Sequence, residues 1–166
     1  MRFDHIAYIG FGANLGDREK NCREGMERLD RSGFCKVVAV SPLYMTEPVD
    51  YLDQDWFVNG AAKVATAMQP AGLLSLLKHI ETEVGRTPGG PRFGPRVLDM
   101  DVLLFDDLVA EGPELILPHP RMHKRRFVLA PLCDIAQDIQ HPVLHKTMRE
   151  LLSALDEEGQ KVVAFP

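Results

Sequence analysis

The strongest β-strand signal in the chain is the stretch VLDMDVLLF, residues 97–105. Side chains two residues apart on a strand point to the same face, so alternate apolar residues are expected to face the core together. The apolar residues at alternate positions are Leu98, Met100, Val102 and Leu104. The opposite face then carries Asp99 and Asp101, about 7 Å apart along the strand.

Two ionised carboxylates at this spacing repel each other and need a counter-charge. Mg²⁺ is the natural one, because it takes one or two carboxylates and leaves its other positions to water and phosphate oxygens. The alternative interpretation of Asp99 and Asp101 is a solvent-facing pair on an ordinary amphipathic strand.

Three arginines precede the aspartate pair. Arg86 follows the helix expected at residues 70–84, Arg92 lies in a Gly- and Pro-rich loop, and Arg96 lies three residues before Asp99. Arginine presents a planar set of donors that binds phosphate oxygens and stays charged. This arrangement suits a metal-bound polyphosphate, because phosphoryl transfer depends mostly on positioning and charge stabilisation. The alternative is that Arg86 and Arg96 merely neutralise the aspartates.

A second basic segment, residues 119–126, holds four cationic residues and no acid. The four are Arg121, Lys124, Arg125 and Arg126. Pro118 and Pro120 hold His119 in an extended backbone, which is a poor place for a histidine that packs in the core. The segment indicates a second group of phosphate-binding side chains, and the alternative is a solvated charged surface.

Phe57 and Asn59 share a face of the strand expected at residues 57–65. An aromatic ring beside a carboxamide can stack a heterocycle and hydrogen-bond its amide edge. From these two residues alone, a core phenylalanine and a strand-end asparagine are the favoured interpretation.

Strands and helices follow one another without strict alternation, which favours an α+β fold over a doubly wound parallel sheet. Apolar runs indicate strands at residues 6–11, 37–44, 57–65, 97–105 and 162–165. Helical spacing indicates helices after the N-cap Asp17, with Cys22, Met26 and Leu29 on one face, and at residues 70–84, 126–135 and 147–155.

The composition indicates one globular domain over residues 1–166, with 45% hydrophobic and 26% charged residues. The net charge of −5 argues against a nucleic-acid partner. Residues 86–96 and 119–126 together carry +7 and the rest of the chain −12, which suits a site for an anionic small molecule. Three cysteines without paired spacing fit a reducing cytoplasm, and no signal peptide or run of about 18 apolar residues points to a membrane.

Five blocks together resemble the 6-hydroxymethyl-7,8-dihydropterin pyrophosphokinases of folate biosynthesis. The blocks are GFGANLGD (10–17), SPLYMT (41–46), NGA (59–61), GPRVLDMD (94–101) and PHPRMH (118–123). They lie in the family's order and spacing between about residues 6 and 136, and the last two are highly specific. The chain departs from the family pattern at Phe93, where members often carry Trp.

The resemblance implies a ferredoxin-like α+β fold, with a mainly antiparallel sheet and helices packed on its faces, in a monomer. It also implies an enzyme that transfers pyrophosphate from ATP to the hydroxymethyl oxygen of the pterin and releases AMP. ATP and the pterin are then the partners, and two Mg²⁺ ions are the expected cofactors.

The resemblance also assigns site residues, position by position. The catalytic set is Arg86, Arg96, Asp99 and Asp101, and the two aspartates would hold the Mg²⁺ ions. The pterin-binding set is Thr46, Pro48, Val49, Phe57, Asn59 and Phe127. The ATP-binding set is Glu81, Arg92, Val102, His119, Arg121 and Arg125.

The same residues also admit two other functions. A sensor that binds nucleotide or pterin without catalysis would show binding and no turnover. Another divalent-metal nucleotidyl or glycosyl transferase could use the Asp-x-Asp pair, but it would not need Phe57, Asn59 and Phe127 together.

Overall fold

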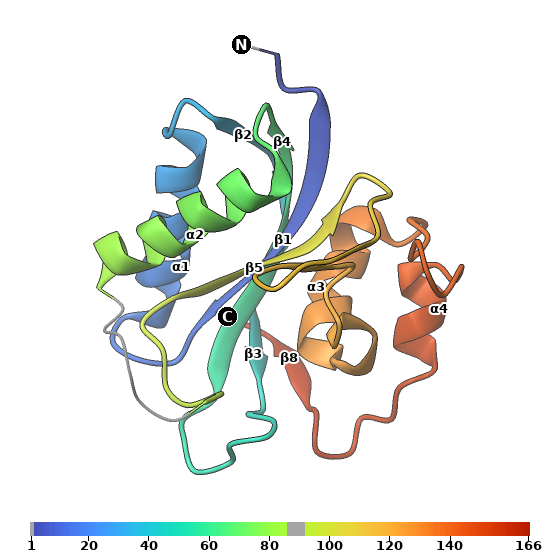
Figure 1. The fold of residues 1–166 in the computed structure, drawn as a ribbon. Coiled ribbons are helices and arrows are strands. Elements are labelled where there is room, and N and C mark those ends of the chain that lie inside the picture. Colours follow the sequence, from blue (N-terminus) through green and yellow to red (C-terminus); the bar gives the residue numbers. More distant parts are fainter. Residues whose placement is uncertain (1, 86–91) are drawn as a thin grey trace.

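The computed structural model describes residues 2–85 and 92–166. The chain folds as an α+β structure with helices on both faces of a twisted sheet (Figure 1). Its elements are β1 (His5–Ala13), α1 (Arg18–Asp30), β2 (Cys35–Val40), β3 (Tyr44–Thr46), β4 (Phe57–Thr66), α2 (Pro70–Val84), β5 (Asp99–Phe105), β6 (Ala110–Glu111), β7 (Ile116–Leu117), a 3₁₀ turn (Met122–Lys124), α3 (Arg126–Ala136), α4 (Met148–Ser153) and β8 (Val162–Ala164).

The main sheet has the order β5-β1-β4-β3-β8, with β2 also paired to β4, and every pairing is antiparallel. Helix α1 connects β1 to β2 across the intervening β4, and α2 connects β4 to β5 across the intervening β1. Two split β-α-β units are therefore interleaved, which is the ferredoxin-like arrangement. This confirms the expected fold class.

The ends of the first two helices follow from local sequence. The Asp17 side chain accepts a hydrogen bond from Lys20 N at the start of α1, as expected for an N-cap. Pro70 lies at the first position of α2, and Gly85 ends that helix with a φ of 123°, which a residue with a Cβ rarely adopts. These local features set where α1 begins and where α2 begins and ends.

The strand expected at residues 37–44 is wrong in one respect, because the structure divides it into β2 and β3. Pro42 lies between them and has no backbone N–H to donate to the ladder. The Ser41 side chain takes over part of the pairing, since its Oγ accepts a hydrogen bond from Ala61 N at 2.9 Å. The division lets β3 pair with the first residues of β4, which line the cavity described below.

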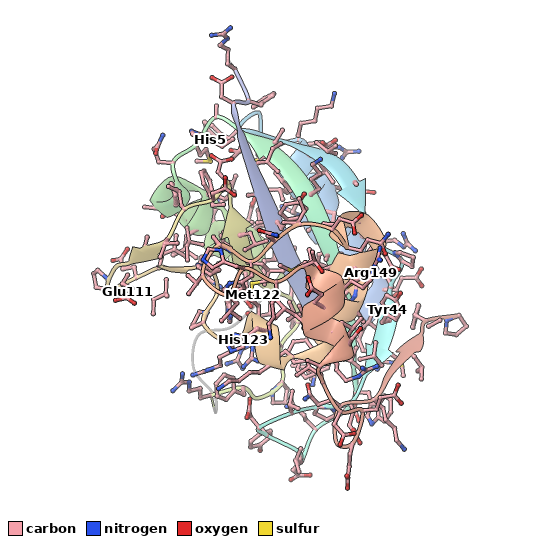
Figure 2. The ribbon with its side chains drawn as sticks, turned by 90° about the vertical axis from the view of Figure 1, so that its right-hand side faces the viewer. His5, Tyr44, Glu111, Met122, His123 and Arg149 are labelled. Carbon is pink, nitrogen blue, oxygen red and sulfur yellow. The ribbon has the colours of Figure 1, made fainter. Side chains whose placement is uncertain are left out.

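Two apolar layers hold the fold together, one on each face of the sheet. Helices α1 and α2 cover one layer, in which Cys22, Met26 and Leu29 are buried as expected. Helices α3 and α4 cover the other layer, which includes Met122 and Leu129 (Figures 1 and 2). The sheet is therefore buried on both faces over its central strands.

A β-bulge in β5 overturns the expectation that Leu104 faces the same layer as Met100 and Val102. Ile9 pairs with Val102 and Tyr8 pairs with Leu104, so one extra residue lies between them on β5. Met100 and Val102 pack in the layer under α1 and α2, whereas Leu104 packs in the layer under α3. A bulge shifts by one residue the alternation of side chains between the two faces of the sheet. The sequence does not reveal this shift, because the residues on both sides of the bulge are apolar.

The three cysteines are free, with Cys22 and Cys35 buried. Burial raises the pKa of the Cys22 thiol to about 12, which makes it inert at neutral pH. Within residues 2–85 and 92–166, no helix combines the length and the apolar character needed to cross a bilayer.

Candidate active site

A cavity of about 250 Å³ lies where β1, β4 and β5 meet the loops that precede β4 and β5 and the start of α3. Most of the predicted site residues line it. The described residues that line it are Gly10, Phe11, Gly12, Thr46, Glu47, Pro48, Val49, Asp50, Phe57, Asn59, Gly60, Arg92, Phe93, Gly94, Arg96, Asp99, Asp101, Leu103, His119, Arg125, Phe127 and Val128.

Gly10 and Gly12 line the cavity from the interior strand β1. Gly12 pairs in register with Asn59 on β4 and with Asp99 on β5. A Cβ on Gly12 would lie 1.8 Å from Asn59 Oδ1 and 3.2 Å from the Val58 carbonyl oxygen. The Asn59 carboxamide can therefore lie close to the β1 backbone only because residue 12 has no side chain.

Asp99 and Asp101 lie on the same strand, and both line the cavity, as their alternation predicts. The pKa of Asp101 is raised to about 7, first by burial and second by the neighbouring Asp99 carboxylate. The ammonium of Lys78, 3.9 Å from Asp101 Oδ1, acts in the opposite direction. At Asp101, the effects of burial and of the Asp99 carboxylate therefore outweigh that of Lys78.

The donor set fits Mg²⁺. Carboxylate oxygens are the ligands that this ion prefers, and it commonly uses one or two of them. The described part of the chain contains no group of three or more His, Cys, Asp or Glu side chains that could enclose a metal. Asp99 and Asp101 would then leave coordination positions to phosphate oxygens and water.

The segment that carries Arg96 is held by two side-chain amides. Arg96 N donates to Asn14 Oδ1 at 2.8 Å, and Arg96 O accepts from Asn14 N at 3.0 Å. Asn14 Nδ2 donates to Gln54 Oε1 at 2.9 Å, and Gln54 Nε2 donates to Phe93 O at 2.8 Å. Asn14 and Gln54 therefore join the end of β1 and the loop before β4 to the segment before β5.

His119 and Arg125 face the cavity from the chain after β7. The pKa of His119 is lowered to about 4, first by burial and then by the nearby Arg125 and Arg121. Its Nδ1 accepts a hydrogen bond from Arg121 N at 3.2 Å, so the neutral ring carries its proton on Nε2. At neutral pH, His119 is a hydrogen-bond donor without charge, and Arg125 is the cation of this pair.

Three guanidinium groups surround the Phe93 ring. The Cζ atoms of Arg92 and Arg121 each lie 4.7 Å from its centroid, and that of Arg125 lies 5.5 Å away. The Cζ atom of Arg125 also lies 5.3 Å from the Phe127 ring centroid. Arg125 Nη2 lies 3.6 Å from Asp50 Oδ2. Cation–π contacts of this kind hold the cations near the cavity.

Aromatic and amide side chains also line the cavity. Asn59 Nδ2 donates to Thr46 Oγ1 at 2.5 Å, and both side chains are buried. Phe57 and Phe127 line the same cavity together with Pro48. Phe57 is therefore a cavity residue and not only a core residue, in contrast to the interpretation favoured from its strand position.

A comparison with protein-family models decides the family. The model for 7,8-dihydro-6-hydroxymethylpterin-pyrophosphokinase (HPPK) matches residues 8–137. The chain belongs to the HPPK family.

Curated relatives agree over most of the chain. It is 43% identical over 160 residues to the 2-amino-4-hydroxy-6-hydroxymethyldihydropteridine pyrophosphokinase of Bacillus subtilis, covering 96% of this chain and 90% of that protein. The protein of the same name from Pseudomonas aeruginosa is 40% identical, with 92% and 93% covered. The folic acid synthesis protein fol1 of Schizosaccharomyces pombe is 40% identical over 93% of this chain, but the chain spans only 21% of that longer protein.

Solved structures show the same fold. The Plasmodium falciparum HPPK-DHPS wild type superposes with a TM-score of 0.69 at 17% identity, over 90% of this chain and 44% of that one. An HPPK-DHPS in complex with substrates superposes with a TM-score of 0.68 at 16% identity, over 93% of this chain and 43% of that one. At these identities the likeness establishes the fold alone.

Four residues that the HPPK resemblance assigns are not among the described residues that line the cavity. Arg86 lies outside the described residues. Glu81 is buried beneath β5, where its carboxylate accepts a hydrogen bond from Met100 N, and the Val102 side chain is buried in the core. Arg121 lies against the Phe93 ring.

The basic segment 119–126 is divided by the fold. His119 and Arg125 line the cavity, whereas Arg126 Nε donates to Gln160 O at 3.2 Å and its guanidinium lies 3.6 Å from Glu157. The basic segment therefore has two roles: some of its side chains line the cavity, and Arg126 binds the C-terminal segment.

Sequence reasoning did not single out several residues that shape the site. Asn14 is in the Gly-rich block, but its bonds to the Arg96 backbone depend on tertiary contacts. Gln54 and Lys78 have no sequence signal, because a glutamine in a loop and a lysine on an amphipathic helix are both commonplace. Phe93 is distinguished in the sequence only by its departure from the family pattern.

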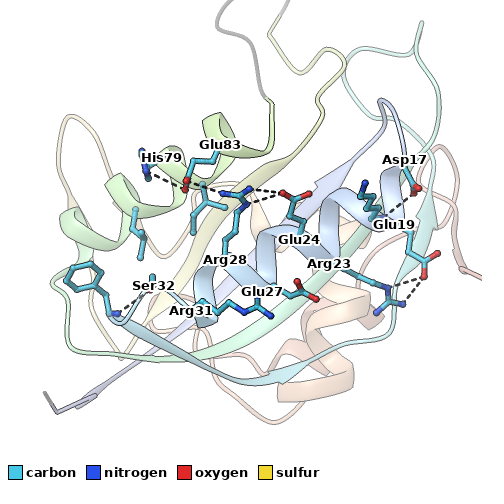
Figure 3. A pocket seen from close by; sticks show the side chains of 14 residues that line it. Asp17, Glu19, Arg23, Glu24, Glu27, Arg28, Arg31, Ser32, His79 and Glu83 are labelled. Carbon is cyan, nitrogen blue, oxygen red and sulfur yellow. Dashed lines mark hydrogen bonds and ion pairs between the residues drawn. The ribbon is translucent and has the colours of Figure 1, made fainter.

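A larger and shallower groove of about 930 Å³ lies between α1 and α2 (Figure 3). Several of its charged side chains pair with one another: Arg28 contacts Glu24 and Glu83, and His79 contacts Glu83. Exposed pairs of this kind contribute little to stability and are typical of a solvated helix surface. The groove is therefore not the candidate active site.

Proposed function

We propose that this chain transfers a pyrophosphoryl group from ATP to the hydroxymethyl group of 6-hydroxymethyl-7,8-dihydropterin, with release of AMP, as a step of folate biosynthesis. The observation that carries the proposal is that one cavity is lined by a carboxylate pair, by aromatic and amide side chains, and by cationic side chains. Membership of the HPPK family supports the same reaction.

The aromatic part of the cavity suits the pterin. Phe57 and Phe127 can stack on the two faces of a flat heterocycle, which contributes about 0.5–1.5 kcal/mol beyond burial. The Asn59–Thr46 pair and the backbone around Pro48 and Val49 offer donors and acceptors to its amide edge. A ligand without matching groups would leave these polar atoms unpaired, at about 1–3 kcal/mol each.

The cationic part suits the triphosphate. Arg92, Arg96 and Arg125 supply guanidinium groups, and His119 supplies a neutral Nε2 donor. The outer edge of β5 offers a place for the base of ATP, because the main-chain groups of alternate residues on an edge strand point away from the sheet. Met100 points its N–H and C=O outward, so Val102, two residues farther along, is expected to do the same.

In the reaction, the hydroxymethyl oxygen attacks the β-phosphorus and loses its proton to solvent. The bond from the β-phosphorus to the oxygen that bridges it to the α-phosphorus breaks, and AMP leaves with that oxygen. Mg²⁺ held at this site would supply positive charge that offsets the negative charge of the phosphate groups. Asp99 and Asp101 would hold the metal, and Arg96 would stabilise the negative charge that develops on the phosphoryl oxygens. The Asn14–Gln54 network keeps Arg96 in position, and the pterin pocket directs the hydroxymethyl group at the phosphate.

The test is nucleotide analysis after incubation with Mg–ATP and 6-hydroxymethyl-7,8-dihydropterin. AMP that forms only when the pterin is present supports the proposal, and ADP or no turnover contradicts it. Asp99→Ala and Asp101→Ala are expected to abolish AMP formation in folded protein. The matched control is Asp107→Ala, which removes an exposed carboxylate from the turn after β5 and should leave the rate unchanged.

A further inference from the structure

Two side chains of α2 bind the main chain of Met100, the residue between the two aspartates. Met100 N donates to Glu81 Oε2 at 2.8 Å, and Lys78 Nζ donates to Met100 O at 3.1 Å. Lys78 Nζ and Glu81 Oε2 are themselves 2.9 Å apart, and the Glu81 side chain is only 1% exposed. Lys78 and Glu81 thus form one unit that contacts both polar groups of this peptide residue.

The place of β5 in the sheet explains why this contact matters. β5 is an edge strand, so the outward N–H and C=O groups of its alternate residues have no neighbouring strand to pair with. At Met100, the side chains of α2 supply the missing partners. They do so at the one residue whose displacement would move Asp99 and Asp101 together.

We propose that Lys78 is a positioning residue for the metal-binding pair Asp99 and Asp101. Through its hydrogen bond to Met100 O and its ion pair with Glu81, it fixes the strand from which both carboxylates project. The inference rests on the proposed function, because it takes the two aspartates as the metal ligands. Groups that hold metal ligands in place commonly change metal affinity by about 10- to 100-fold when they are removed.

A purely electrostatic role for Lys78 predicts the opposite result. The ammonium lies 3.9 Å from Asp101 Oδ1 and repels any cation that binds there. If charge were its only effect, removing Lys78 would strengthen metal binding. If positioning is its main effect, removing it weakens metal binding, so the sign of the change separates the two roles.

The experiment is a titration of the nucleotide-free protein with Mn²⁺, with free Mn²⁺ measured by electron paramagnetic resonance. Lys78→Met is expected to bind Mn²⁺ about tenfold more weakly than the wild type. Lys78→Arg keeps the charge and the donors and should restore most of the affinity. Lys36→Met removes the same charge from the exposed face of β2 and should bind as the wild type does.

Each other result overturns the inference. Binding by folded Lys78→Met that equals or exceeds that of the wild type refutes the positioning role. Asp101→Asn reports on the underlying assumption: if it binds Mn²⁺ normally, the metal site of the proposed function fails and the positioning role fails with it. The Lys78 side chain is 42% exposed, so its replacement leaves no cavity in the core. If Lys78→Met nevertheless fails to fold, Lys78→Gln takes its place, and it too must bind Mn²⁺ more weakly than the wild type.

Discussion

Gly12→Ala is expected to weaken pterin binding while nucleotide binding stays intact. The new Cβ would lie 1.8 Å from Asn59 Oδ1 and 2.9 Å from Asn59 Cγ. To reach ordinary van der Waals contact, the Asn59 oxygen must move by about 1.6 Å. The backbone cannot relieve the contact, because the Val58 carbonyl oxygen lies 3.2 Å from the same Cβ position.

The displacement disrupts the hydrogen bond from Asn59 Nδ2 to Thr46 Oγ1, which is 2.5 Å long and buried. A buried polar group that loses its partner costs about 1–3 kcal/mol, which corresponds to a loss of about 5- to 150-fold in pterin affinity. Calorimetric titration with 6-hydroxymethyl-7,8-dihydropterin, in the presence of a non-hydrolysable ATP analogue, measures this loss. The affinity for the analogue itself is expected to stay within twofold of the wild-type value.

Gly10→Ala is the matched control on the same strand and the same face. Its Cβ would lie 3.4 Å from the Leu103 side chain, which can adjust, so pterin affinity should stay close to that of the wild type. Wild-type pterin affinity in folded Gly12→Ala would refute the reasoning. An equal loss in Gly10→Ala would also refute it, because it would show that any side chain on this strand has the same effect.

Three further outcomes are expected. The raised pKa of Asp101 means that the folded state favours the protonated carboxyl, so stability in metal-free buffer should fall as pH rises from about 4 to about 7. Melting temperatures measured in EDTA should show this fall for the wild type and not for Asp101→Asn. The lowered pKa of His119 means that the folded state disfavours the protonated ring, so stability should fall as pH drops from 6.5 toward 4. Urea unfolding should show a smaller fall for His119→Gln, and NMR should show the wild-type ring titrating near pH 4. Asn14→Ala removes the side-chain bonds to the Arg96 backbone and to Gln54, and it should lower the free energy of unfolding by about 2–4 kcal/mol and slow AMP formation. Unchanged stability and rate in Asn14→Ala would show that the network does not hold Arg96.

Local sequence was sufficient wherever the determining contacts span only a few residues. The cap at Asp17 and the helix at residues 70–84 are both expected from the sequence, and the structure confirms them. The common face of Asp99 and Asp101 was also expected, because strand alternation decides it within three residues. The failures at Pro42 and at the β5 bulge have a shared cause, since an unbroken apolar run does not reveal where a ladder is interrupted.

The amino-acid sequence by itself therefore determined most of the helices and strands, the family resemblance, and which kinds of side chain the site contains. Only the tertiary structure decided how these groups meet. It brought Gly12 between Asn59 and Asp99, attached Lys78 and Glu81 to the Met100 backbone, and directed Arg126 toward the C-terminal segment and away from the cavity. The physical reason is that strand register and helix packing depend on contacts between residues far apart in the chain, whereas helix caps and strand alternation depend on near neighbours.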